Sequence, residues 1–329
     1  MKNYLEHGVR IVMRDWLEIK SKDRLLIVTS DKHLLEANAL KEYALKKNAL
    51  VDIMIVEKSG IQVGVFFDEN ENIFDDYTAI IGATDYSLIT TRAAKKAIEK
   101  GNRFLSLPLS VNNNKSMLSY DFITMDTKKS KMMANVVMKY ISNSSMIHIT
   151  TSSGTNLKVY KQGRIPGFFN GVVRDGKGYS SASFEIYVPI EENKTEGTMI
   201  VDGSLGYLGK PERSVKITFS EGKITEIDQN SSGLLLKEYI EGYNDLNMYV
   251  ASEFGIGLNS YSKCEGNCYI EDESAYGTFH IGFGRNIALG GSHEASGHFD
   301  LVSLEPDIYA DNRKIMQQGR FIIPEPQIY

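Results

Sequence analysis

Histidines and carboxylates able to bind metal ions recur in four short apolar segments of the C-terminal half of the chain. In the segment GHFDLV, residues 297–302, an extended backbone places His298 and Asp300 on one face, because successive side chains of a strand alternate. An imidazole and a carboxylate at this spacing can bind the same metal ion. For so short a pattern, a surface pair on an edge strand is the plainer alternative.

Three further polar residues stand in apolar, mostly glycine-containing runs. His280 lies in GTFHIGFG, where the glycines leave room for a ligand or a second strand. A lone histidine is more often satisfied in the core by a backbone carbonyl, so the glycines carry the functional interpretation. Glu253 in EFGIGLN and Glu185 in FEIYVP follow a similar logic, because a buried carboxylate must be paired or bound to a cation. An exposed glutamate on a turn is the alternative for Glu253.

Together these residues form a candidate ligand set, which consists of Glu185, Glu253, His280, His298 and Asp300. Carboxylate and imidazole ligands suit zinc, cobalt, manganese or iron. A catalytic zinc ion usually has three protein ligands, so five favour two ions about 3.5–4 Å apart that share a carboxylate. Glu273, shortly before His280, is a further candidate, whereas the neighbouring acids at 191–192 and 271–272 are expected to be solvated.

Two other groups of polar residues have plainer interpretations. Cys264 and Cys268 form a single C-x3-C pattern, for which an ordinary loop is favoured over a metal or redox site. Arg285, Asn286 and His293 lie between the two histidine segments. They are candidates for contacts with a substrate, but ordinary loop polarity is the favoured interpretation.

The elements that must position these residues change character near the middle of the chain. Apolar runs at residues 24–29, 51–56, 78–82 and 104–107 alternate with helical patterns, which predicts βαβ units and a parallel sheet. No G-x-G-x-x-G turn follows these runs, so a dinucleotide-binding function has no support. Beyond them, a hairpin over 216–228 and glycine-rich short strands predict a mixed, mainly antiparallel fold. We expect an α/β domain over residues 1–143 and an α+β metal-binding domain over residues 144–329.

Charge and composition restrict the setting of the protein. The net charge of −5 gives no general attraction to phosphate backbones, so nucleic acid is not an expected partner. No apolar stretch approaches the ~20 residues that span a bilayer, and the N-terminal residues lack the pattern of a signal peptide. With only two cysteines, a disulfide framework is excluded. We expect a cytoplasmic protein without a membrane partner that acts on a small peptide or another small molecule.

The four segments, in this order, resemble the aminopeptidase T and aminopeptidase S group of metallo-aminopeptidases. The matching motifs are FEIYVPIEENKTEGTMIVDG, EFGIGLN, DESAYGTFHIGFG and GHFDLV. The resemblance implies that the five candidate ligands hold two metal ions, with Glu273 as a further ligand, and that the protein is a homodimer. Two features depart from that family: the interval between His280 and His298 is short, and no tyrosine follows His280 closely.

A second group shares this scaffold, the 2,5-dihydroxypyridine ring-cleaving dioxygenases. They use one iron ion held by two histidines and an aspartate, a triad that His280, His298 and Asp300 would satisfy. The presence of both Glu185 and Glu253 favours hydrolysis. We therefore expect a metalloprotease, an aminopeptidase in which zinc, cobalt or manganese ions activate water, with the iron dioxygenase as the alternative.

In the expected hydrolase, Glu253 or Glu273 is the catalytic carboxylate that accepts the proton of the metal-bound water and passes it to the leaving amine. A binding or structural protein that kept the fold and lost its chemistry is a third possibility. The complete set of ligand-type residues argues against it.

Overall fold

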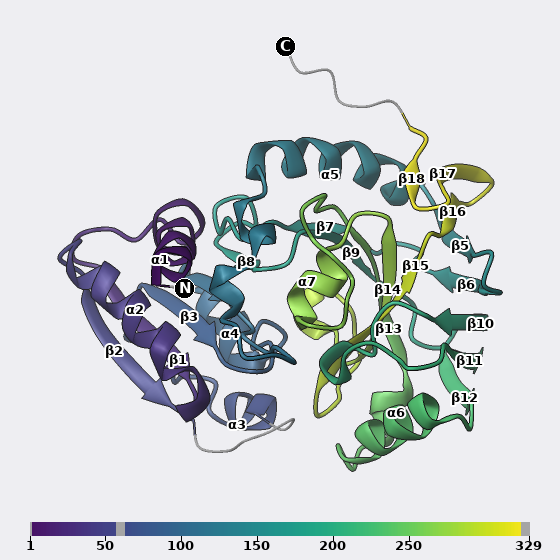
Figure 1. Cartoon of the computed structure of the whole chain (residues 1–329), viewed down its shortest axis with the longest axis horizontal. Helices are drawn as coiled ribbons and strands as arrows, with labels where there is room; N and C mark the ends of the chain where they lie inside the picture. The colour runs from purple at the N-terminus through teal and green to yellow at the C-terminus, as the bar shows by residue number, and fades with distance from the viewer. Residues whose placement is uncertain (1, 57–62, 324–329) are drawn as a thin grey trace. The chain divides into compact units, whose positions relative to one another are not determined.

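The computed structural model describes residues 2–56 and 63–323 (Figure 1), so the end of the expected second domain, residues 324–329, lies outside the described part. Contacts divide the chain into two compact units. The first contains residues 1–127 and 169–183, and the second contains residues 128–168 and 184–329. A contact unit is not the same as a segment that folds alone, so the expected division between residues 143 and 144 stays a prediction.

The first unit is built on a five-stranded parallel sheet with the order β2-β1-β3-β4-β8. Its strands are β1 Arg24–Thr29, β2 Leu50–Ile55, β3 Ala79–Ala83, β4 Arg103–Ser106 and β8 Tyr179–Ser181. Its helices are α1 Lys2–Arg10, the π-helix η1 Ile11–Trp16, α2 Leu34–Leu45, α3 Val63–Glu69 and α4 Arg92–Glu99. β3 is buried at every position, as is usual in the middle of a parallel sheet. The predicted α/β fold with a parallel sheet is confirmed, and β8 is an addition from later in the chain.

The second unit contains two sheets, with the orders β12-β11-β10-β6-β5-β16-β17-β18 and β15-β14-β13-β9-β7. The strands of the larger sheet are β5 Met146–Thr150, β6 Asn156–Tyr160, β10 Glu196–Val201, β11 Val215–Ser220, β12 Lys223–Ile227, β16 Asp307–Ala310, β17 Arg313–Gln317 and β18 Arg320–Phe321. Those of the smaller sheet are β7 Gly167–Phe169, β9 Glu185–Pro189, β13 Ala251–Gly257, β14 Thr278–Gly284 and β15 His298–Leu304. The helices are α5 Thr127–Ser142, α6 Ser231–Glu241 and α7 Tyr269–Ser274.

Antiparallel pairing dominates this unit, which confirms the expected mixed fold. The predicted hairpin is the pair β11–β12, with Glu221 and Gly222 at positive φ in its turn. In the smaller sheet, β9, β13, β14 and β15 pair antiparallel to one another, and α7 packs against β13 and β14 (Figure 1).

The smaller sheet has one apolar face and one face that carries the candidate ligands. On β14, Phe279, Ile281 and Phe283 are fully buried on the apolar side, and His280 and Gly282 point to the other side. The apolar side is completed by Ile186, Val188, Phe254, Ile256, Phe299 and Leu301, each at most 1% exposed. Because a slip of one residue would turn these side chains outward, burial of the apolar face fixes the direction in which His280 points.

In the first unit, Gly171 marks a close approach between the segment that leads to β8 and the N-terminal helices. Gly171 has a φ of +79°, and a Cβ atom on it would lie 2.2 Å from Cδ2 of the Trp16 ring. Trp16 is fully buried and is the one tryptophan of the chain. A side chain at position 171 is therefore opposed both by the backbone conformation and by the indole ring.

We expect Gly171→Ala to lower the free energy of unfolding of the first unit by about 2–4 kcal/mol, the sum of a left-handed alanine and an overpacked core. Trp16 fluorescence in a denaturant titration measures this unit specifically. The matched control is Gly101→Ala, because Gly101 has a φ of +85° but no described atom within 4 Å of the added Cβ. A loss no larger than that of the control would show that the ring contact costs nothing.

Candidate metal centre

All five predicted ligands are placed by the strand alternation of the smaller sheet. Glu185 lies on β9, His280 on β14, and His298 and Asp300 lie on β15. Glu253 lies on β13, where it alternates with the buried Phe254 and lies opposite Gly282 on the ligand-bearing face. The β-bulge of this strand comes just before it, between Ala251 and Glu253. Gly282 in turn lies opposite Asp300, which completes a row across three strands. The structure therefore brings all five residues to one face.

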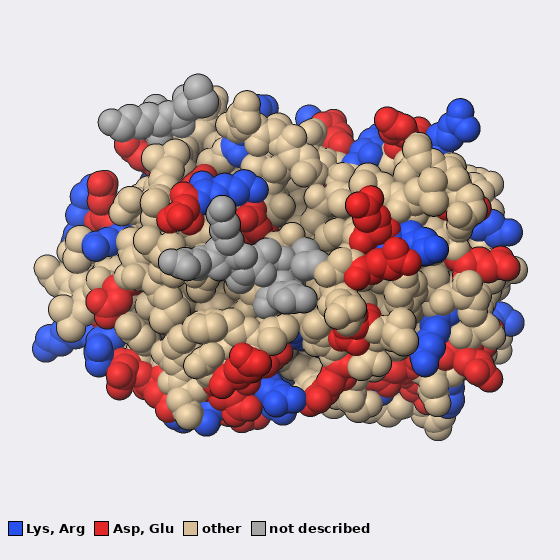
Figure 2. Space-filling model, turned by 90° about the horizontal axis from the view of Figure 1, so that it is seen from below, with Lys and Arg blue, Asp and Glu red and all other residues tan. Residues whose placement is uncertain are grey.

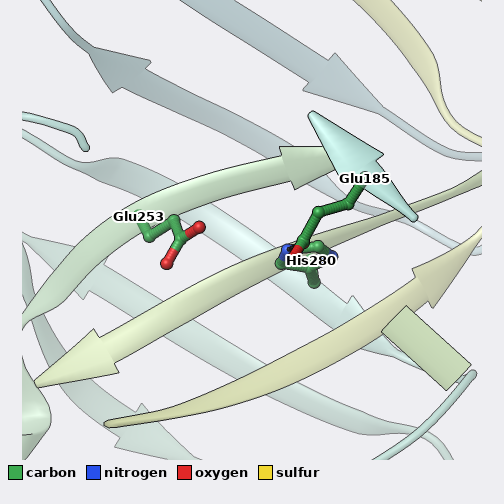
Figure 3. A group of neighbouring side chains, drawn as sticks. All are labelled: Glu185, Glu253 and His280. Carbon is green, nitrogen blue, oxygen red and sulfur yellow. Dashed lines mark ion pairs between the residues drawn. The ribbon is translucent and has the colours of Figure 1, made fainter. Parts of the chain in front are cut away.

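Short distances connect these side chains in two groups. Nε2 of His280 lies 2.8 Å from Oε2 of Glu185, whose side chain reaches over to the imidazole in Figure 3. Nε2 of His298 lies 3.1 Å from Oε2 of Glu253 and 3.4 Å from Oδ1 of Asp300. Within each group, Glu185 with Glu253 and His280, and Glu253 with His298 and Asp300, the potential ligand atoms lie within 4.8 Å of one another. Glu253 is common to both, and no such group of described residues contains both histidines.

Two glycines make the space in which these side chains meet. A Cβ atom on Gly255 would lie 1.9 Å from Nε2 of His280. One on Gly282 would lie 2.8 Å from Oδ1 of Asp300 and 2.9 Å from Cε1 of His298. Any other residue at either position would occupy the volume of the candidate ligands, so the glycines of the sequence motifs have a steric reason.

The site concentrates negative charge in a buried place. Glu185, Glu253 and Asp300 are 4–5% exposed, and His280 is 1% exposed. Burial raises the pKa of Glu253 to about 7, although the His298 imidazole acts to lower it. Burial would lower the pKa of His280, but the Glu185 carboxylate outweighs it and raises this pKa to about 9. Without a metal ion, protonated imidazoles neutralise the carboxylates, which is the electrostatic task that a bound cation would perform.

Contacts behind the ligand face orient two of the side chains. Nδ1 of His298 lies 2.9 Å from the carbonyl oxygen of Arg285, which holds the proton on Nδ1 and leaves Nε2 available to a metal. The hydroxyl of Tyr269 donates a hydrogen bond to Oδ2 of Asp300. Oδ1 of Asp300 is buried and accepts no hydrogen bond from the described residues. The sequence analysis did not identify Tyr269 as a functional residue. The one indication in the sequence was its position, four residues before the candidate ligand Glu273.

The acidic run at residues 271–273 is a buried helix, so the expectation that Glu271 and Asp272 are solvated is wrong. These residues form part of α7 and are 6% and 1% exposed. Asp272 is tolerated because it accepts hydrogen bonds from Ser204 Oγ at 2.7 Å and Gly266 N at 2.9 Å. Glu273 is 4% exposed, and burial followed by the charge of Glu185 raises its pKa well above the usual range. It lies within electrostatic reach of the ligands but belongs to neither group.

Residues between β14 and β15 make structural contacts. The Asn286 side-chain amide donates to the Ser252 carbonyl and to Glu192, both at 2.9 Å, and one Arg285 nitrogen donates to the Ser296 carbonyl at 2.5 Å. Nε2 of His293 lies 2.9 Å from the Asn247 carbonyl oxygen. These contacts agree with the favoured interpretation of loop polarity.

The two cysteines are free thiols, and neither belongs to the two ligand groups formed by the described residues. Burial raises the pKa of both thiols above its usual range. The thiolate form that binds metals is therefore disfavoured at both positions.

Two surface properties bear on partners. Within residues 2–56 and 63–323, no helix is long and apolar enough to cross a bilayer. On the face shown in Figure 2, acidic and basic side chains are interspersed among a larger neutral surface, so that face carries no continuous basic patch.

Comparisons with known proteins identify relatives of two kinds. The model of the NicX family, described as 2,5-dihydroxypyridine 5,6-dioxygenase, matches residues 75–323, which include every candidate ligand. The 2,5-dihydroxypyridine 5,6-dioxygenase of Pseudomonas putida KT2440 is 25% identical over 146 residues. That match covers 41% of this chain and 41% of the relative, so it spans about two fifths of the relative's length.

Two solved structures share the fold. The 2,5-dihydroxypyridine dioxygenase from Pseudomonas putida KT2440 aligns with 98% of this chain and 97% of its own, with a TM-score of 0.77 and 16% identity. AmpT from Thermus thermophilus aligns with 98% of this chain and 100% of its own, with a TM-score of 0.63 and 14% identity. At these identities the alignments show a common scaffold.

The expected function, a hydrolase of the aminopeptidase type, is wrong. The matching family and the similar sequence are both described as a dioxygenase, which is an oxidoreductase. The prediction gave weight to Glu185 and Glu253 and too little to the short interval between His280 and His298. The likeness to aminopeptidase T is limited to the fold, which AmpT shares.

We expect Gly255→Ala to reduce metal affinity at least ~10-fold, because its Cβ would displace the His280 imidazole. Metal content after dialysis, measured by elemental analysis, tests this, and circular dichroism checks the fold. Ile256→Val is the control, since it trims the adjacent side chain on the opposite, apolar face. Equal metal content in both variants would show that a side chain at position 255 does not weaken metal binding.

We expect the ion pair of Glu192 to stabilise the second unit above pH ~4.5. Arg164 donates two hydrogen bonds to this carboxylate, and these together with Asn286 outweigh burial and lower its pKa to about 2. Because the folded-state pKa lies below the unfolded value, the stabilisation is lost as pH falls from ~4.5 towards ~2.

Glu192→Gln should therefore cost about 1–3 kcal/mol at pH 7 and much less near pH 2, in denaturant titrations followed by circular dichroism. The exposed Glu238→Gln on α6 serves as control. A cost for Glu192→Gln that does not change with pH would contradict the assignment.

Proposed function

The chain belongs to the NicX family of 2,5-dihydroxypyridine 5,6-dioxygenases, and on this premise we propose that it is a metal-dependent, ring-cleaving dioxygenase of a hydroxylated pyridine. The observation that carries the proposal is the extent of the family match, which spans residues 75–323 and thus the whole of the buried ligand face. The proposed substrate is 2,5-dihydroxypyridine or a close relative with the same two hydroxyl groups.

We propose iron as the metal, held by His280, His298 and Asp300, so that one ion would bind two histidines that belong to different groups in the protein without metal. Two histidines and one carboxylate with open coordination positions suit non-haem Fe(II). Oδ1 of Asp300, which accepts no hydrogen bond from the described residues, and Nε2 of His298, whose Nδ1 is held by a carbonyl, support this choice of donors. Ferrous iron bound there would supply the redox chemistry with which a dioxygenase transfers both atoms of O2 to its substrate.

Glu185 and Glu253 are additional to that triad, and we propose that they act on the substrate. Each lies within 3.1 Å of an imidazole Nε2, so metal binding by these nitrogens would leave the carboxylate oxygens beside the site as acceptors. A substrate hydroxyl placed against Glu253 could then transfer its proton to Oε2. Glu273 is the second candidate for this role, because it is buried next to the same group of charges.

The sharing of Glu253 between two ligand groups favours a second stoichiometry. In that arrangement Glu253 would bridge two divalent ions, such as zinc, cobalt or manganese, with one histidine on each ion. The number of metal ions per chain, from elemental analysis, decides between one iron and a bridged pair. We also propose that the protein is a homodimer. Elution at the 36.9 kDa of a single chain would contradict this.

The protein is first loaded with Fe(II) under anaerobic conditions, and in this state no substrate should disappear. When O2 is admitted, the protein should consume one O2 for each 2,5-dihydroxypyridine lost. An oxygen electrode and the decay of the pyridine absorbance measure both quantities. His298→Ala and Asp300→Ala should each lower the rate at least ~100-fold, since each removes a proposed ligand. His293→Ala is the matched control, because this histidine lies outside both groups. Loss of substrate without O2 uptake, or wild-type rates in both ligand variants, would contradict the proposal.

A further inference from the structure

The hydroxyl of Tyr269 is bound to one particular oxygen of the Asp300 carboxylate. It donates to Oδ2. The other oxygen, Oδ1, is buried without a hydrogen bond from the described residues and lies 3.4 Å from Nε2 of His298. The two oxygens of one side chain therefore have different surroundings. Oδ2 is engaged by the protein, whereas Oδ1 faces a second ligand atom of the candidate metal centre.

Tyr269 is itself held from two sides. Its ring stacks on the ring of Tyr207, with centroids 3.9 Å apart and planes 12° apart, and both residues are at most 9% exposed. Tyr269 is the first residue of α7, and Asp272 in the same helix is bound by the hydroxyl of Ser204 at 2.7 Å. A stacked, buried ring on an anchored helix has little freedom to turn, so its hydroxyl occupies a defined place.

The segment that supplies Tyr207 approaches the strand of Asp300 directly. Gly206, the first residue of the 3-10 helix η6 Gly206–Leu208, has a φ of +64°. A Cβ on it would lie 2.6 Å from the backbone oxygen of Asp300. Glycine thus permits η6 to pack on β15 at the position of the ligand, which brings the stacking partner of Tyr269 to the same place.

We propose that Tyr269 is a positioning residue of the metal centre, which holds Oδ2 of Asp300 so that Oδ1 alone is presented to the metal beside His298. A carboxylate that binds through one oxygen occupies one coordination position instead of two, which leaves a further position for substrate or O2. The inference rests on the metal centre of the proposed function, but it concerns the geometry of binding and not the reaction.

The test compares Tyr269→Phe with Tyr207→Phe in the full chain, with Co(II) as the probe. Both variants remove one hydroxyl from the same pair of stacked rings and keep the rings. For Tyr269→Phe we expect Co(II) affinity to fall about 10–100-fold. The visible absorption bands of the bound Co(II) should also change, because Asp300 is freed to rotate. Tyr207→Phe should keep the wild-type spectrum and an affinity within about 3-fold of wild type.

The spectrum separates positioning from general support of the fold. If Tyr269 only stabilised the fold, its variant would unfold at lower denaturant concentration and bind less Co(II), but the bound ion would keep the wild-type spectrum, and this result would overturn the proposal. So would wild-type affinity and spectrum. Altered Co(II) bands in a chain whose iron form cleaves no pyridine would remove the proposed function and leave this inference standing. If the wild type cleaves the pyridine but the Co(II) bands of Tyr269→Phe are unchanged, the proposed function would stand and this inference would be wrong.

Discussion

The burial of charged side chains on one face of the smaller sheet is the constraint on which the rest of the second unit depends. Three carboxylates and two imidazoles share a space from which water is largely excluded, and unpaired charges of one sign in such a place are strongly destabilising. In the protein without a metal, the raised pKa values of His280 and Glu253 show that protonation is favoured where negative charge is buried. Each proton taken up there offsets part of the charge that a divalent ion would neutralise, so metal binding and proton release are coupled.

The two faces of the sheet have different roles. Aromatic and branched residues on one face supply the burial that holds the strands in register, and this leaves the opposite face free to carry residues that contribute little to packing. Gly255 and Gly282 lie on the ligand-bearing face, where the absence of a side chain leaves room for the ligands. A site of this kind depends on a rigid support, since a shift of one strand would separate the ligands.

Much of the site was predictable because it follows from alternation. His298 with Asp300, and His280 among glycines, could be assigned to one face from the letters alone. Glu253 alternates with the apolar Phe254 and Ile256 in the same way, but the sequence alone did not decide between burial and an exposed turn. Tyr269 and the burial of Asp272 were missed because both depend on a six-residue helix docked by contacts distant in sequence. The reaction was mistaken for a related reason: the same residue types suit hydrolytic and oxidative metal chemistry, and their identity alone does not choose between them.

The chain crosses between the two units three times. The polypeptide leaves the first unit after residue 127, returns to it at residues 169–183 to add β8, and leaves again. A fragment that ended near residue 143 would lack this last strand, and β4 would become a bare, apolar sheet edge open to pairing with other chains. During synthesis, β4 must therefore wait until part of the second unit has been made. Until then β4 would form an unpaired sheet edge.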